Sequence, residues 1–193
     1  MKVLLINGSR RNEFCTNKAL SIIANELNKE NIETEIFFIG DKIYNGQIDE
    51  TVKEVAALVK DIDGFVVGSP VYYASPSGEV ISFLDRLFSV AGADLTFKPA
   101  CAVTSARRGG TTATIDVLNK YFMFNQMPIV SSNYWNMVHG NTPDEVLEDK
   151  EGIQIMENLG KNMAWLIKCI NMGAQNGINH PEVTAKIKTN FTR

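Results

Sequence analysis

The chain has few residues that bind metals or form crosslinks. Its 193 residues include three cysteines and two histidines. Cys15, Cys101 and Cys169 are far apart in the sequence, and no CxxC pair occurs. An odd number of scattered cysteines is typical of a reducing compartment and not of a disulfide framework. The spacing also argues against a zinc ribbon or an iron–sulfur cluster, and we expect no bound metal.

Long hydrophobic runs and a strong charge of one sign are also absent. No run approaches the roughly 18 apolar residues that span a bilayer, and the first residues lack the features of a signal peptide. The net charge is −3, with no long basic stripe. Nucleic-acid binding depends on such a stripe. We therefore expect a cytoplasmic protein that binds neither membranes nor nucleic acid.

The composition is that of a globular protein. Apolar residues make up 45% of the chain and charged residues 21%, which is ordinary for a soluble domain. No linker, repeat or low-complexity segment interrupts the sequence, so we expect a single domain over residues 1–193.

Strands and helices are predicted to alternate along the chain. Short apolar runs predict strands over residues 3–6, 33–39, 64–68, 100–104 and 128–130. Apolar residues at helical spacing predict helices over residues 17–30, 51–59, 77–90, 111–125, 150–171 and 182–191, with an irregular stretch at 132–142. This alternation predicts an α/β fold: a flavodoxin-like three-layer sandwich with a five-stranded parallel sheet of order 2-1-3-4-5 and helices on both faces.

The loop after the first strand, residues 8–17, has the features of a phosphate site. It contains Gly8, Ser9 and Arg11, and the next helix opens at Thr16 and Asn17. Free N–H groups and the dipole at a helix start favour an anion, and the hydroxyls and the arginine add donors. The loop has neither the GK[ST] of a Walker A motif nor three spaced glycines. The alternative is a simple turn in which Thr16 caps the helix.

The loops after the third and fourth strands complete a ligand site. In the loop after the third strand, Tyr72 and Tyr73 can face a flat ligand. The alternative is that they are surface aromatics packed on the next helix. In the loop after the fourth strand, Gly109 and Gly110 let the backbone approach a ligand closely, and Arg107 and Arg108 add positive charge. The alternative is that the arginines form a solvated turn and the glycines the entry to the next helix. A phosphate loop, an aromatic wall and a third loop for the far edge of the ring describe flavin mononucleotide (FMN).

These loops resemble those of the NAD(P)H-dependent FMN reductase family. The shared motifs are Gly-Ser-x-Arg at residues 8–11 with Thr16, Gly-Ser-Pro-x-Tyr at residues 68–72, and a small-residue, glycine-rich loop at 104–110. The likeness covers about residues 1–170. By this resemblance, the FMN phosphate is held by Ser9, Arg11, Thr16 and Asn17. The isoalloxazine is lined by Pro70, Val71, Tyr72 and Tyr73, and its other side is closed by Thr104, Ser105, Arg107 and Gly109.

The chain departs from the family pattern in two places. Relatives with an iron–sulfur cluster carry a compact cysteine motif that is absent here, and many relatives have a glycine where this chain has Phe14-Cys15. The aromatic segment 133–140 resembles a loop that approaches the flavin in related oxidoreductases. There His139 is a candidate catalytic residue, a proton donor to a quinone-like acceptor, or else a histidine that only holds the loop. The resemblance also implies a homodimer or homotetramer.

The function that this resemblance implies is an FMN-dependent NAD(P)H oxidoreductase. Electrons would pass from NAD(P)H through FMN to a quinone, a flavin, a nitro or azo compound, or a similar acceptor. One alternative is a non-enzymatic flavodoxin-type electron carrier, which the two arginines and the weak net charge disfavour. Another is a regulatory protein of the same fold that binds no flavin.

Overall fold

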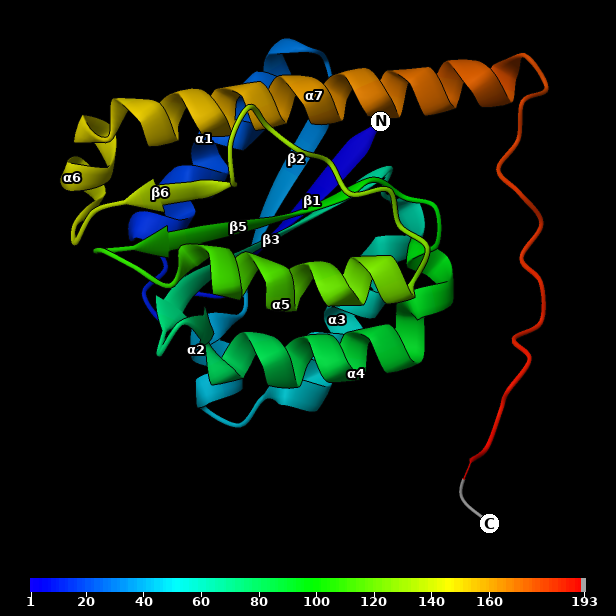
Figure 1. The fold of residues 1–193 in the computed structure, drawn as a ribbon, viewed down its shortest axis with the longest axis horizontal. Helices are drawn as coiled ribbons and strands as arrows, with labels where there is room; N and C mark the ends of the chain where they lie inside the picture. Colours follow the sequence, from blue (N-terminus) through cyan, green and yellow to red (C-terminus); the bar gives the residue numbers. More distant parts are fainter. Residues whose placement is uncertain (192–193) are drawn as a thin grey trace.

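The fold is built around a parallel sheet, which the computed structural model describes within residues 1–191 (Figure 1). The parallel strands are β1 (Lys2–Asn7), β2 (Glu33–Phe38), β3 (Gly64–Tyr72), β5 (Ala100–Ala106) and β6 (Met137–His139). Their order is β2-β1-β3-β5-β6, and the short β4 (Ser75–Pro76) pairs antiparallel with β3. Without β4, this is the predicted order 2-1-3-4-5, so the predicted fold class is confirmed.

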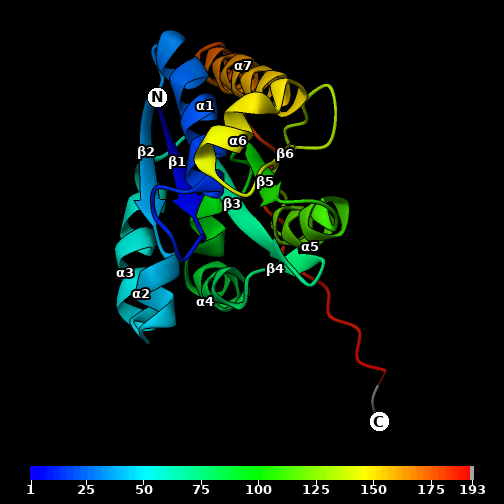
Figure 2. The same cartoon turned by 90° about the vertical axis from the view of Figure 1, so that its left-hand side faces the viewer.

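Helices cover both faces of the sheet, as the turned view in Figure 2 shows. One face carries α1 (Cys15–Lys29), α6 (Pro143–Glu148) and α7 (Lys150–Gln175). The other face carries α2 (Gly40–Tyr44), α3 (Ile48–Leu58), the short 3₁₀ helix Val59–Asp61, α4 (Gly78–Leu95) and α5 (Thr111–Phe124). The result is the predicted three-layer sandwich.

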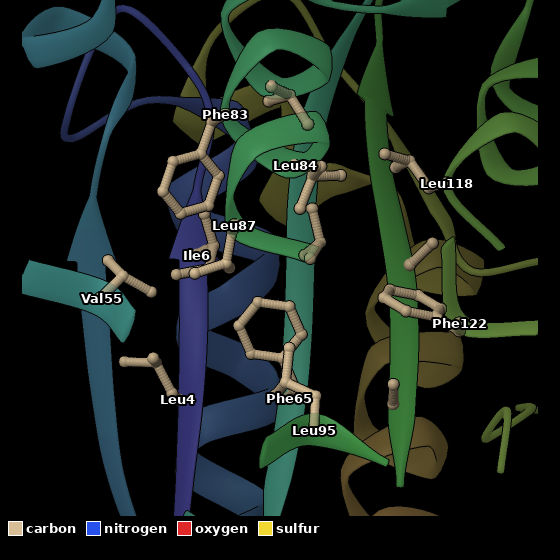
Figure 3. Close-up of a cluster of buried hydrophobic side chains, with 14 of the residues drawn as sticks. Leu4, Ile6, Val55, Phe65, Phe83, Leu84, Leu87, Leu95, Leu118 and Phe122 are labelled. Atoms are coloured by element: carbon tan, nitrogen blue, oxygen red, sulfur yellow. The ribbon is translucent and has the colours of Figure 1, made fainter. Parts of the chain in front are cut away.

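Alternation along the buried strands supplies both hydrophobic cores. In β1, Leu4 and Ile6 pack into the cluster under α3, α4 and α5, whereas Val3 and Leu5 pack into the cluster under α1 and α7. Successive side chains of a strand point to opposite faces, so one apolar run serves two layers. In the first cluster Phe65 meets Phe122 edge to face, with ring centroids 6.5 Å apart (Figure 3).

Two predicted elements are wrong. The fifth strand of the sheet is Met137–His139, inside the stretch predicted to be irregular, while segment 128–130 makes only an isolated bridge from Ile129 to Ala100. Pro128 has no N–H to donate to a neighbouring strand, and three residues are too few to show the alternation of a strand.

The predicted helix over residues 182–191 is also absent. The segment has no regular structure, and its apolar residues Val183, Ile187 and Phe191 are exposed. A ten-residue helix is marginal in water unless its apolar face packs against something. Within residues 1–191, none of the helices has the length and apolar character required to cross a membrane.

Candidate functional site

The three predicted loops meet at the carboxyl edge of the sheet. In the register of the strands, Asn7 lies beside Gly68, and Ser69 lies beside Thr104. The N–H of Gly8 donates to the carbonyl of Gly68 at 2.9 Å, which joins the first loop to the second. This edge, where the direction of strand order reverses, is the usual ligand site of open α/β sheets.

Asn7, which the sequence did not single out, organises the first loop. Its Oδ1 accepts from the N–H of Ser9 at 3.1 Å, and its Nδ2 donates to the carbonyl of Asn12 at 2.9 Å and to Oδ1 of Asn17 at 3.4 Å. The hydroxyl of Ser9 in turn accepts from the N–H of Arg11 at 3.1 Å. The sequence feature that could have pointed to Asn7 is an asparagine at the end of an apolar run, since a polar side chain buried there requires hydrogen-bond partners.

The start of α1 has the properties of an anion site. Its N-cap residue, Phe14, gives no side-chain hydrogen bond, and the first turn holds no acidic residue. The guanidinium of Arg11 stacks on the ring of Phe14, 3.3 Å from the ring centroid. No carboxylate in the described part of the chain forms an ion pair with Arg11. Uncapped N–H groups, a favourable dipole and an unpaired cation fit the FMN phosphate.

Thr16 does not cap the helix. The helix begins one residue earlier, at Cys15, and the Thr16 hydroxyl is buried and lies 2.8 Å from the hydroxyl of Ser105. Two predicted site residues from different loops therefore contact each other directly. The neighbouring hydroxyl of Thr104 is buried with no hydrogen-bond partner among residues 1–191.

The second loop is a tight hairpin with an unusual turn. Tyr72 of β3 pairs with Ser75 of β4, and the two residues between them, Tyr73 and Ala74, have φ of +51° and +56°. Such a turn normally takes asparagine and glycine, because positive φ strains a residue with a Cβ. Tyr73 is fully exposed and Tyr72 is 43% exposed, so neither is packed under the next helix. Pro70 and Val71, both half-buried, lie at the foot of this hairpin.

We expect the double substitution Tyr73→Asn and Ala74→Gly to stabilise the protein. Both new residues tolerate positive φ, so the free energy of unfolding should rise by about 1–2 kcal/mol. Urea unfolding monitored by circular dichroism measures the change. Tyr73→Phe keeps the backbone strain and should leave the stability unchanged. A double variant less stable than the parent would contradict the interpretation of this turn as strained.

In the third loop, Gly110 and not Gly109 is sterically required. Gly110 has φ of +93°, and a Cβ there would lie 2.8 Å from Cα of Ala74 in the hairpin. A Cβ on Gly109 would meet no atom within 4 Å. The second and third loops are therefore packed together through Gly110, while Arg107 and Gly109 lie on the exposed surface of the third loop.

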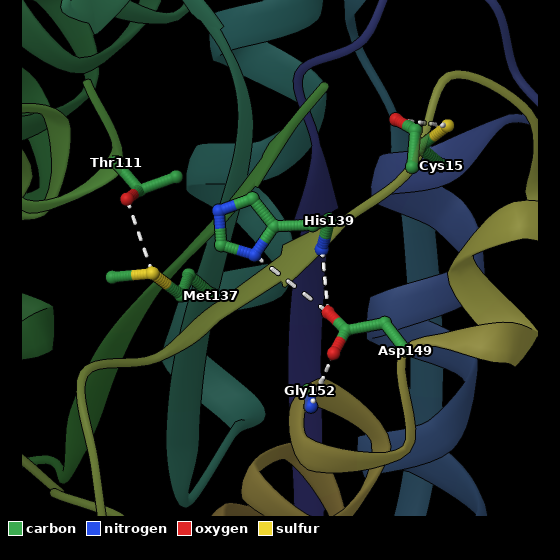
Figure 4. A network of polar contacts seen from close by, with 7 residues as sticks. Cys15, Thr111, Met137, His139, Asp149 and Gly152 are labelled. Carbon is green, nitrogen blue, oxygen red and sulfur yellow. Dashed lines mark hydrogen bonds and ion pairs between the residues drawn. The ribbon is translucent and has the colours of Figure 1, made fainter. Parts of the chain in front are cut away.

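His139 ends β6 beside Ala106 of β5, and its side chain is 42% exposed. Figure 4 shows its link to Asp149, the N-cap of α7. The carboxylate of Asp149 accepts from the N–H of His139 at 2.7 Å and from the N–H of Gly152 at 2.9 Å. The imidazole Nδ1 lies 3.7 Å from the same carboxylate. The hydrogen bond therefore holds the backbone of His139, on the strand next to the third loop, and the ring lies close to the carboxylate without a hydrogen bond to it.

Asp149→Ala should destabilise the protein by about 2–3 kcal/mol, because the change removes a helix cap and a charge-assisted hydrogen bond to β6. Chemical unfolding measures this difference. Thr142→Ala, which removes the N-cap of the six-residue α6, is the matched control and should cost at most about 1 kcal/mol. Equal losses in the two variants would show that the contact with β6 contributes nothing.

Cys15 lacks the features of a nucleophile. Its thiol donates to the carbonyl of Gly140 at 3.6 Å, and burial raises the pKa of the Cys15 thiol above its ordinary value. Reactive cysteines have a lowered pKa. Cys15 therefore packs the start of α1 against the chain after β6. In residues 1–191, no group of three or more potential side-chain ligands is placed to hold a metal ion.

Two curated relatives show what the sequence is similar to. An iron–sulfur flavoprotein of Methanocaldococcus jannaschii is 31% identical over 191 aligned positions, and the alignment covers 88% of this chain and 99% of that protein. An NADPH azoreductase of a Bacillus species is 32% identical over 123 residues, 62% of this chain and 65% of the enzyme.

Solved structures show the same fold at low sequence identity. The structure of RosB superposes with a TM-score of 0.72 at 14% identity, covering 100% of this chain and 92% of RosB. An NADH:FMN oxidoreductase, EmoB, gives 0.67 at 18% identity, covering 86% and 89%. The family model for NADPH-dependent FMN reductase matches residues 1–142. The chain therefore belongs to the NADPH-dependent FMN reductase family.

Proposed function

We propose that this protein uses bound FMN to pass electrons from NAD(P)H to a small aromatic acceptor such as a quinone, a free flavin, or a nitro or azo compound. The observation that carries the proposal is the uncapped start of α1, where the unpaired guanidinium of Arg11 lies at the same sheet edge as an exposed tyrosine hairpin. The similar NADPH azoreductase supports azo compounds as one class of acceptor.

The positions of the site residues support the following proposed roles. FMN, when bound, supplies the electron-transfer chemistry. Arg11, Asn17 and the first N–H groups of α1 would hold its phosphate, with Ser9 shaping the loop. Tyr72 and Tyr73 would line the ring, and Ser105 and Arg107 would close its far side. An arginine here would also favour the added negative charge after reduction.

His139 would give a proton to the acceptor. A quinone that receives a hydride still requires one proton to become a hydroquinone, and an imidazole can act as a general acid that donates it. Partial exposure lets the ring regain its proton from water.

The exposed pair Tyr134 and Trp135, packed with ring centroids 4.6 Å apart, suits a homodimer or homotetramer interface. We place the protein in the cytoplasm, where thiols stay reduced.

An absorbance spectrum of the purified protein tests the proposal. We expect a flavin spectrum after addition of FMN, and bleaching within seconds when NADPH or NADH is added without oxygen. A yellow protein that neither nucleotide bleaches would favour an electron carrier, and a protein that takes up no FMN would favour a flavin-free regulator.

Initial-rate kinetics with a quinone as acceptor give a separate prediction. Because both substrates use one flavin face, the initial-rate lines at different quinone concentrations should be parallel. Intersecting lines would count against a shared flavin face.

A further inference from the structure

A hollow beside the hairpin borders the first and second FMN loops and extends from them towards α2 and α4. Its volume is about 590 Å³, and it opens between the first loop, α2, the hairpin and the start of α4. Its lining is both aromatic and charged. The lining includes Arg10, Tyr44, Tyr72, Tyr73, Glu79 and Ser82.

Arg10 determines the charge of the ligand that this hollow can hold. Its guanidinium lies 3.4 Å above the centroid of the Tyr44 ring, at the end of α2. Both side chains are exposed, and among residues 1–191 no carboxylate forms an ion pair with Arg10. Stacking fixes the plane of the guanidinium and leaves its N–H edge available. A planar cation held in this way is suited to bidentate recognition of a phosphate.

The other walls of the hollow suit a flat, hydroxylated ligand. Tyr72 and Tyr73 present exposed aromatic rings, and the strained backbone at Tyr73 holds its side chain in solvent. Strain at an exposed turn is typical of a functional position. Glu79, in the first turn of α4, would repel a phosphate but can accept hydrogen bonds from a sugar hydroxyl or an amino group. Ser82 can donate or accept.

We propose that this hollow binds the adenosine 2′-phosphate half of NADPH, with Arg10 pairing with the 2′-phosphate. The purine ring would stack on the tyrosines, and Glu79 would accept from a ribose hydroxyl or the purine amino group. Tyr72 and Tyr73 border both this hollow and the predicted flavin site, so one dinucleotide can extend from the flavin face into the hollow. The inference rests on the proposed function, and it assigns the 2′-phosphate preference to a single residue.

Calorimetric titration of the FMN-loaded protein with two redox-inert fragments tests the inference. Adenosine 2′,5′-bisphosphate is the adenosine part of NADPH, and 5′-AMP is the corresponding part of NADH. The first should bind at least about 10-fold more tightly, since a bidentate charged contact is worth roughly 10- to 100-fold. Arg10→Ala should abolish that preference, and Arg10→Lys should restore only part of it. Tyr44→Leu, which removes the stacking ring, should weaken the bisphosphate by several-fold.

Steady-state kinetics give a second readout. The ratio of kcat/KM for NADPH to that for NADH should fall about 10-fold or more in Arg10→Ala. Arg86→Ala, which removes the same charge from the middle of α4, should leave the ratio unchanged. Equal binding of the two fragments by the parent protein would overturn the inference, and so would loss of the preference in Arg108→Ala instead of Arg10→Ala. Failure of the proposed function is distinct: no FMN is retained, or neither nucleotide bleaches it.

Discussion

Arg11→Ala combined with Thr16→Ala is expected to weaken FMN binding by roughly 30- to 1000-fold, which corresponds to about 2–4 kcal/mol. The guanidinium of Arg11 has no acidic partner in the described chain, so its charge is available for a phosphate. The hydroxyl of Thr16 contacts that of Ser105 at 2.8 Å. Its removal therefore leaves a buried hydroxyl without a partner and loosens the contact between the first and third loops.

Fluorescence titration of the apoprotein with FMN measures the change, because the fluorescence of a flavin changes when it binds. The matched control is Arg86→Ala with Thr184→Ala, which removes the same residue types at exposed positions. The control should bind FMN as the parent does. If the double variant at the first loop kept parental affinity, the phosphate would lie elsewhere and the assignment of this loop would be wrong.

Gly40→Ala is expected to deform the first loop, although Gly40 lies outside it. A Cβ on Gly40 would lie 1.9 Å from the carbonyl oxygen of Ser9, 2.3 Å from its carbonyl carbon and 2.8 Å from the nitrogen of Arg10. All three are backbone atoms, so no side chain can rotate away. Relief requires movement of the loop or of α2, at a cost of about 1–3 kcal/mol. FMN affinity should fall by roughly 10- to 100-fold.

Gly173→Ala is the matched control for this prediction. Gly173 lies in α7, and the nearest atom to its Cβ would be the carbonyl oxygen of Ile178 at 3.5 Å, an ordinary contact. Alanine is the better helix former by about 1 kcal/mol, so this variant should be equally or more stable and should bind FMN normally. Parental FMN affinity in Gly40→Ala would show that the loop tolerates the movement.

The sequence predicted the strands that are buried on both faces. In β1, β3 and β5 the apolar runs are continuous and bounded by turn residues, so they were readable without tertiary information. The strand β6 was not readable because its three residues owe their conformation to hydrogen bonds with β5 and Asp149. The segment 182–191 shows the opposite error, since its apolar residues have helical spacing but stay exposed.

The candidate site shows the same division. Ser9, Arg11, Tyr72 and Tyr73 were proposed as site residues from motifs, because residue type and local spacing are enough to predict a phosphate loop and an aromatic wall. Asn7 and Gly40, which contact the first loop, and Asp149, which bonds His139, were missed. Their roles depend on neighbours that are distant in the sequence or on contacts that have no motif.

The sequence by itself determined the α/β fold class, the first four parallel strands and the loops that follow three of them, because apolar periodicity and turn residues are local properties. The tertiary structure decided how these loops meet. The contact of Thr16 with Ser105, the packing of Gly110 on the hairpin, and the stacking of Arg10 on Tyr44 join residues from different elements. Such contacts form only after the sheet brings its carboxyl ends together, since their geometry is fixed by packing and not by the residues alone.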